Sequence, residues 1–163
     1  MESNGGFSLF FMPADPLAKS ITFAGEFLHS LDDKHRITIP SAWRKGEGDE
    51  FFVVPDESNE FLSAMPPHEF SGVRDVINSN KELSPQERQH SIRRFYTKAR
   101  QCVMDRQGRL VLPEDHCRQA GLEKEVMLAG VYNKFEIWNP KAYAKCEEAG
   151  LEISKKVSGM IVI

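Results

Sequence analysis

The sequence predicts an α+β fold made of two copies of one short, strand-rich unit. The first observation is internal repetition: residues 28–73 align with residues 101–146 at a constant shift and without a gap. The second is that both copies show the same order of strands, turns and helices. The third is a composition of 40% hydrophobic and 28% charged residues in 163, as in ordinary soluble globular proteins. Each unit is too short to bury a core alone, so we expect the two units to complete each other.

The elements of each unit follow from local patterns. A strand at 25–31 or 100–104 leads into a polar turn at 32–35 or 105–108, and an aliphatic strand follows at 36–39 or 109–112. Pro40 or Pro113 then ends the pairing. A short helix is predicted at 41–45 or 114–120 and two more strands at 51–54 and 60–65, or 126–131 and 134–138. A helix opened by Pro67 or Pro140 closes each unit.

An additional helix separates the two units. Ser84-Pro85-Gln86-Glu87 is typical of a capping box with proline at the first helical position, and an apolar stripe follows it. We therefore predict a flexible N-terminal arm at 1–20, a first unit with its closing helix at 21–80, and a connecting helix at 81–98. A second unit follows at 99–149 and a C-terminal tail at 150–163, in which residues 157–163 are either loose or a strand that adds to a neighbour.

Charge is unevenly distributed along the chain. The formal net charge is −3, which excludes nucleic-acid binding by bulk charge alone but not by a local basic face. Residues 86–109 carry an excess of basic residues, whereas residues 46–70 are strongly acidic. A solvated basic helix beside an acidic neighbour would also explain this division. The basic side is a candidate phosphate-binding surface.

Several classes of protein are disfavoured by the sequence. No apolar run is long enough to span a membrane, and the N-terminus lacks the features of a secretory signal, so we expect a cytoplasmic protein. The three cysteines are widely spaced, and we expect reduced, mostly buried thiols. We expect no metal and no cofactor.

The two polar turns share one motif, an aspartate followed four residues later by an arginine. Asp32 and Asp105 can accept backbone N–H groups and thereby shape the turns. Arg36 and Arg109 then present guanidinium groups that suit a phosphate or a guanine edge. A simple Asp–Arg pair within each hairpin is the structural alternative, and such surface pairs contribute only about 0–1 kcal/mol.

These residues carry a resemblance to a known family. The stretch from Glu26 to Pro40, the Asp105-Arg106-Gln107-Gly108-Arg109 turn with its following strand, and Phe135-Glu136-Ile137-Trp138 resemble the MraZ family of bacterial transcriptional regulators. The resemblance covers residues 23–148. It implies two tandem AbrB-like modules whose swapped hairpins form a small pseudo-symmetric β-barrel flanked by helices. It also implies a homo-oligomeric ring that binds short direct repeats in promoter DNA of the division and cell-wall gene cluster, and hence association with the nucleoid.

The resemblance also assigns roles to single residues. The DNA-contacting arginines map to Arg36 and Arg109, and the neighbouring basic residues Lys34 and Arg106 add charge at the turn tips. Gly108 is the residue that the family has before this arginine, but the first turn has His35 instead. Because glycine tolerates positive φ better than histidine, the first turn is either shaped differently or His35 itself contacts phosphate.

Two other functions are considered. An AbrB-type antitoxin-like module would bind a protein partner, with residues 150–163 as the grip. An enzyme is disfavoured because the chain has no glycine-rich phosphate loop, HExxH or GxSxG motif. His116 and Cys117 are adjacent on a predicted helix and point in different directions, so they do not form a base–nucleophile pair. Asp32 and Asp33 lie in a water-exposed turn that offers little to shift their pKa values.

Overall fold

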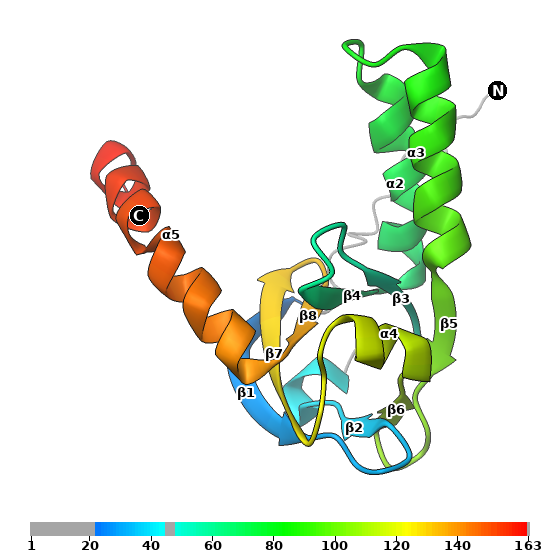
Figure 1. Cartoon of the computed structure of the whole chain (residues 1–163), viewed down its shortest axis with the longest axis vertical. Helices are drawn as coiled ribbons and strands as arrows, with labels where there is room; N and C mark the ends of the chain where they lie inside the picture. Colours follow the sequence, from blue (N-terminus) through cyan, green and yellow to red (C-terminus); the bar gives the residue numbers. More distant parts are fainter. Residues whose placement is uncertain (1–21, 45–47, 163) are drawn as a thin grey trace, which may run out of the picture.

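The computed structural model describes residues 22–44 and 48–162. These residues form a mixed α+β structure with a six-stranded antiparallel sheet and a separate two-stranded ribbon. A pair of helices projects from one end of the molecule, and a third helix projects from its side (Figure 1). The predicted arm at 1–20 and Lys45 lie outside the described residues.

The elements lie close to their predicted positions. The first half of the chain contains β1 (Phe23–Ser30), β2 (Arg36–Thr38), the 3-10 helix η3 (Ser41–Arg44), β3 (Glu50–Pro55), β4 (Phe61–Met65) and α2 (Pro67–Ser79). The second half contains α3 (Pro85–Lys98), β5 (Arg100–Val103), β6 (Arg109–Val111), α4 (Glu114–Gln119), β7 (Glu125–Tyr132), β8 (Phe135–Trp138) and α5 (Pro140–Met160).

The strand pairing exchanges partners between the two halves of the chain. The sheet order is β1-β7-β8-β4-β3-β5, and β2 pairs with β6 in the ribbon. If each strand is replaced by its equivalent in the other half, the same order results, read from the opposite edge of the sheet. Only the β3–β4 and β7–β8 hairpins pair within one half. Each half therefore depends on the other for its strand partners, as its small size predicts.

The closed barrel that the resemblance implies is not formed by the described strands. β1 pairs only with β7, and β5 pairs only with β3, so these two strands are the edges of an open sheet. The ribbon lies against the sheet instead of joining it. The backbone of the chain thus continues from β1 into β2, and from β5 into β6, through polar turns that leave the sheet.

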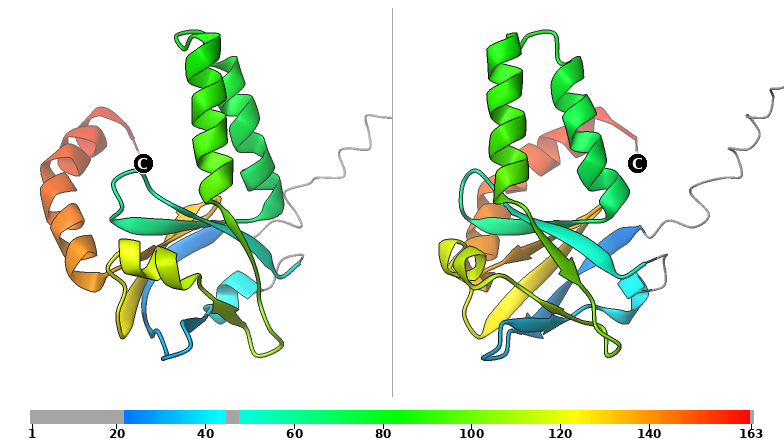
Figure 2. Two further views of the ribbon diagram at one scale, coloured as in Figure 1. Left: turned by 45° about the vertical axis from the view of Figure 1, so that its right-hand side comes forward. Right: turned by 90° about the vertical axis from the view of Figure 1, so that its right-hand side faces the viewer.

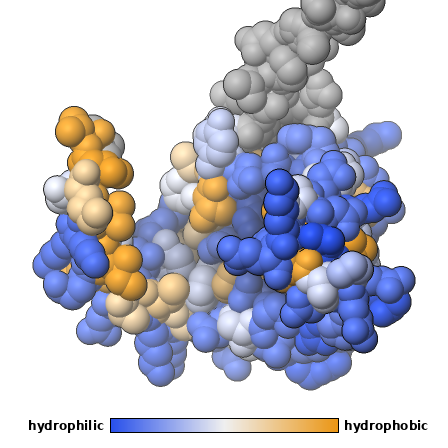
Figure 3. Space-filling view, turned by 90° about the horizontal axis from the view of Figure 1, so that it is seen from above, coloured by the Kyte–Doolittle hydropathy of each residue, from blue (hydrophilic) through white to orange (hydrophobic). Residues whose placement is uncertain are grey.

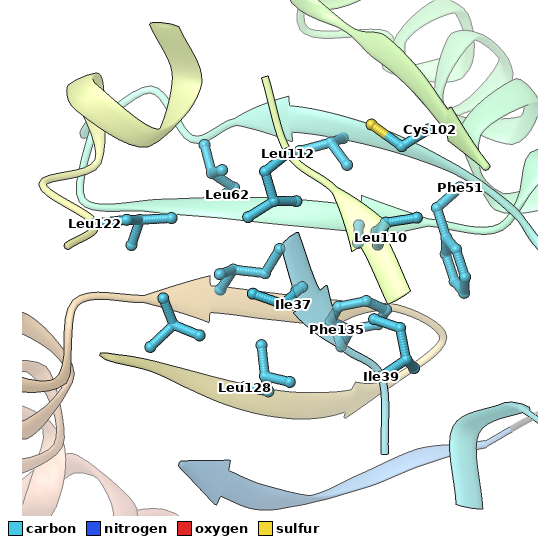
Figure 4. Close-up of a cluster of buried hydrophobic side chains, with 14 of the residues drawn as sticks. Ile37, Ile39, Phe51, Leu62, Cys102, Leu110, Leu112, Leu122, Leu128 and Phe135 are labelled. Atoms are coloured by element: carbon cyan, nitrogen blue, oxygen red, sulfur yellow. The ribbon is translucent and has the colours of Figure 1, made fainter. Parts of the chain in front are cut away.

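The core lies between the ribbon and the sheet. Ile37 of β2 and Leu110 of β6 are opposite each other in the ribbon and are 1% and 0% exposed. Figure 4 shows both pointing into a cluster that includes Leu62 and Leu128 from the two hairpins of the sheet. Because strand residues alternate between faces, burying these two side chains leaves their neighbours in the ribbon facing solvent.

The two helices that project together are α2 and α3. α3 begins with the predicted capping box, in which the Ser84 hydroxyl accepts from the Glu87 N–H and the Glu87 carboxylate accepts from the Ser84 N–H. The Tyr96 hydroxyl of α3 donates to the Phe70 carbonyl of α2 at 2.7 Å. Phe70 also stacks on Phe52 of β3. The helical pair is thus attached to the sheet at one end, opposite the two polar turns (Figure 2).

The expectation that residues 157–163 are loose or form a strand is wrong for residues 157–160, because α5 continues to Met160. The Asn139 side chain caps the start of this helix by accepting from two backbone N–H groups. A glycine within a helix costs only about 1 kcal/mol relative to alanine, and good helix formers surround Gly150. Within the described ranges, no helix has the length and apolar character needed to cross a membrane.

Candidate nucleic-acid interface

The ribbon places the two motif arginines on one outward face. Arg36 is opposite Val111, and Arg109 is opposite Thr38. Residues that are directly opposite in an antiparallel pair point to the same side, so these four side chains share the face that is turned away from the core. Thr38 and Val111 are exposed, and the side chains of Arg36 and Arg109 are 28% and 32% exposed. The two arginines are diagonal neighbours, and the Cα atoms of such neighbours lie about 7–8 Å apart.

The first turn is organised by the carboxylate of Asp32. One carboxylate oxygen, Oδ1, accepts from the backbone N–H groups of Lys34 and Arg36 at 2.9 and 2.8 Å. The other oxygen, Oδ2, accepts from Nε of Arg36 at 2.7 Å. The backbone closes the same turn, since the His35 N–H donates to the Asp32 carbonyl. One aspartate thus fixes both the turn and the direction of the arginine.

The second turn repeats this arrangement. Oδ1 of Asp105 accepts from the N–H groups of Gln107 and Arg109, each at 2.9 Å, and Oδ2 accepts from Nε of Arg109 at 2.9 Å. The Gly108 N–H donates to the Asp105 carbonyl. Each turn also accepts a backbone hydrogen bond from the residue that follows the ribbon strand of the other half. The Ile39 N–H donates to the Gly108 carbonyl, and the Leu112 N–H donates to the His35 carbonyl.

The residue before each arginine has a left-handed backbone in both turns. Gly108 has φ +80° and His35 has φ +60°, so the first turn has the shape of the second despite lacking glycine. The first turn is therefore not shaped differently from the second, because His35 takes up the left-handed backbone conformation that glycine adopts more easily. For a residue with a Cβ atom this conformation costs about 1–2 kcal/mol.

Arg44 distinguishes the second turn from the first. A Cβ atom at Gly108 would lie 2.3 Å from Nη1 of Arg44 and 2.7 Å from its Cδ, so the Arg44 side chain lies directly over the glycine. This brings an additional basic side chain from η3 to the second turn. Nothing in the local sequence around Arg44 indicates this contact, because it depends on how η3 packs beside β6.

The electrostatics of the turns favour charged carboxylates. Hydrogen bonds from the Arg36 and Arg109 backbone N–H groups are the main cause that holds the pKa values of Asp32 and Asp105 below their ordinary value. The simple Asp–Arg pair that was the alternative explanation of the motif is present in both hairpins. These pairs occupy only Nε of each arginine, and among the described residues no acceptor binds the terminal nitrogens Nη1 and Nη2.

The remaining predicted residues lie around this face. Lys34 and Arg106 occupy exposed positions at the tips of the two turns, and His35 is half-buried. The arrangement therefore collects Lys34, Arg36, Arg106 and Arg109 at one end of the molecule, with Arg44 beside the second turn. We call the outward side of the ribbon and these two turns the basic ribbon face. Thr38 and Val111 also belong to this face but were not singled out from the sequence.

The other candidate chemistry does not assemble into a site. His116 and Cys117 are both buried in α4, and burial raises the pKa of the Cys117 thiol to about 11, which keeps it protonated. Burial also lowers the pKa of His116. Among residues 22–44 and 48–162, no three potential metal ligands come together. Cys102 is buried too, whereas Cys146 is exposed.

Comparison with known proteins shows the family that this chain resembles. Residues 95–161 match a family described as "MraZ protein, putative antitoxin-like". Three similar proteins are each named "Transcriptional regulator MraZ". The protein of Desulforamulus reducens is 34% identical over 74% of this chain and 84% of its own length. The proteins of Natranaerobius thermophilus and Symbiobacterium thermophilum are 32% and 35% identical over 86% and 82% of this chain, and 96% and 98% of their own lengths.

These relatives are named as regulators of transcription and not as enzymes. Each of them aligns with more than two thirds of this chain. The chain belongs to the MraZ family.

Proposed function

We propose that this protein is a transcriptional regulator that binds double-stranded DNA through the basic ribbon face. The observation that carries the proposal is that Arg36 and Arg109 lie on the same outward face of the ribbon, each partly exposed and hydrogen-bonded to its aspartate through Nε. The major groove of B-DNA is about 12 Å wide and admits a two-stranded ribbon. Lys34 and Arg106 at the turn tips are placed to contact phosphates on either side, which would fix the register of the ribbon.

The finer assignments of this proposal come from the family resemblance. In it, the chain consists of two tandem AbrB-like modules, and the exchange of strand partners between the halves supports this interpretation. The target is a set of short direct repeats upstream of the division and cell-wall genes, and the protein acts in the nucleoid. The names of the relatives support a regulatory role.

The proposal is tested by a gel-shift assay on DNA from the region upstream of the protein's own gene, at two salt concentrations. We expect Arg36→Ala and Arg109→Ala each to weaken binding at least tenfold, and the affinity of the parent protein to fall steeply with salt. Arg93→Ala is the matched control, because Arg93 is an exposed arginine on α3, away from the ribbon. Parent-like binding by both ribbon variants would mean that the face is misassigned.

We also propose that the protein acts as a homo-oligomer, with α5 as a contact surface. Beyond Gly150 this helix is exposed and carries large apolar side chains, including Ile153 at 66% and Met160 at 73% exposure. Figure 3 shows apolar side chains gathered on this helix, which stands apart from the body of the molecule. One ribbon face offers few contacts, and linking several copies would raise affinity for repeated sites without any new contact.

Solution mass measurement tests this second proposal. We expect the parent protein to be larger than a monomer and Ile153→Glu to reduce its mass, while Lys155→Glu on the same helix leaves it unchanged. The antitoxin-like alternative instead requires a different protein to bind α5. This alternative is favoured if the purified protein is a monomer that binds a different protein stably, and if Ile153→Glu abolishes this binding.

A further inference from the structure

Four residues define the outward face of the ribbon, and only two of them are arginines. Arg36 is opposite Val111, and Thr38 is opposite Arg109, so the arginines occupy one diagonal and two β-branched residues occupy the other. Val111 is 54% exposed although it lies directly opposite Arg36 in the ribbon. The two β-branched residues hold equivalent positions in the two halves, and each presents a γ-methyl group to solvent.

We propose that Val111 and Thr38 are specificity-determining residues that contact the 5-methyl group of thymine next to the bases bound by the arginines. This inference rests on the proposed DNA binding by the basic ribbon face. In the major groove the thymine methyl group is the apolar feature that distinguishes thymine from cytosine, and apolar side chains read it by contact.

The conformation of the arginines makes such a contact feasible. The backbone N–H and the Nε of Arg36 bind the same carboxylate, that of Asp32, at 2.8 and 2.7 Å, so the side chain is tied to the turn at its Nε. Arg109 is held in the same way by Asp105. An arginine that is tied to its own turn at Nε cannot extend freely away from the ribbon. The ribbon can therefore approach the base edges closely enough for the shorter valine and threonine to touch them.

The spacing across the ribbon fits the spacing of bases. Side chains that are directly opposite in an antiparallel pair have Cβ atoms about 4.5–5.5 Å apart. Successive bases of one DNA strand are about 3.4 Å apart along the helix axis. Val111 would therefore lie over a base one or two positions from that bound by Arg36, and Thr38 would have the same relation to Arg109. A thymine at this distance from a guanine is the expected target.

The two halves differ in the chemical groups with which Val111 and Thr38 can contact a base. Val111 offers only methyl groups, whereas Thr38 offers one methyl group and a hydroxyl that donates or accepts a hydrogen bond. We therefore expect removal of the thymine methyl group to affect the contact made by Val111 more strongly, because the threonine hydroxyl can still bind the base.

The test uses the DNA fragment upstream of the protein's own gene, synthesised with either thymine or deoxyuridine, which lacks only the methyl group. For the parent protein we expect deoxyuridine to weaken binding about fourfold for each thymine methyl group that the ribbon touches. Val111→Ala should bind thymine DNA more weakly than the parent and should discriminate less between the two DNAs. Val111→Thr keeps one γ-methyl group but adds a hydroxyl, so it should discriminate less than the parent and more than Val111→Ala. Thr38→Ser should also show a reduced discrimination.

The controls separate this inference from the proposed function. Val76→Ala truncates an exposed valine of α2, far from the ribbon, and should behave as the parent does on both DNAs. If the parent binds both DNAs equally while Arg109→Ala fails to bind, methyl reading is wrong and DNA binding by the face stands. An unchanged deoxyuridine penalty in both Val111→Ala and Thr38→Ser also overturns it. If Arg36→Ala and Arg109→Ala both bind as the parent does, the proposed function itself fails.

Discussion

The two polar turns have the same hydrogen bonds but different residues at the position of strain. In each, an aspartate carboxylate binds two backbone N–H groups and the Nε of the arginine four residues later. The left-handed position is Gly108 in one turn and His35 in the other. The aspartate, and not the glycine, therefore determines the shape of this turn. Glycine only makes the shape easier to adopt.

The largest expected effect comes from removing the aspartate in either turn. Asp32→Ala and Asp105→Ala each remove three hydrogen bonds and free the arginine, so both should lower the melting temperature by several degrees and weaken DNA binding. Thermal unfolding and the gel-shift assay measure the two effects. Asp33→Ala is the matched control, because Asp33 is an exposed neighbour that accepts none of these bonds in the described structure. A turn that kept its stability without its aspartate would contradict the interpretation.

The next effect separates the two turns. Gly108→Ala places a Cβ atom at φ +80° and against Arg44, so we expect the free energy of unfolding to fall by about 1–2 kcal/mol. His35→Ala exchanges one residue with a Cβ atom for another, so the change should stay below about 0.5 kcal/mol. Denaturant unfolding of the two variants measures the difference. Equal losses would show that the left-handed conformation is not what distinguishes these positions.

A smaller effect of opposite sign is expected for His35→Gly. Glycine removes the strain at φ +60° but loses more conformational entropy on folding, so the net gain in the free energy of unfolding should be at most about 1 kcal/mol. Denaturant unfolding again provides the measurement. If DNA binding falls while stability rises, His35 contributes to DNA contact, which was the other role that the sequence allowed.

The smallest effect concerns pH. The pKa values of Asp32 and Asp105 lie below the ordinary value of 3.8, chiefly because their carboxylates accept backbone hydrogen bonds. Their contribution to stability is therefore fully present above about pH 4 and is lost as the pH falls through their lowered pKa values. Unfolding measured between pH 2 and 6 should show a steeper acid loss for the parent than for Asp105→Asn. NMR titration should place both carboxyl groups below 3.8.

Local patterns predicted most elements to within a residue or two. Runs of β-branched and aliphatic residues indicated β2 and β6, and the prolines and the capping box indicated the starts of α2, α3 and α5. These signals are local, because side-chain periodicity and capping depend on neighbours in sequence. Gly150 was misleading for the same reason: one unfavourable residue does not end a helix when its neighbours favour it.

The contacts across the chain could not be predicted in this way. Repetition indicated that the halves complete each other, but it did not indicate that β1 pairs with β7 and β5 with β3. The position of Arg44 over Gly108 depends on how η3 packs. Thr38 and Val111 are ordinary strand residues by propensity, and only the register of the ribbon places them beside the arginines.

The exchange of strands between the halves has a consequence for biosynthesis. β1 meets its partner β7 across a separation of about 100 residues, and a chain rich in such distant pairings folds slowly. At a translation rate of about 5–20 residues per second, β7 is synthesised about 5–20 seconds after β1. During that interval the nascent first half has an unpaired strand edge, so the emerging chain depends on protection from aggregation until its last strands are made.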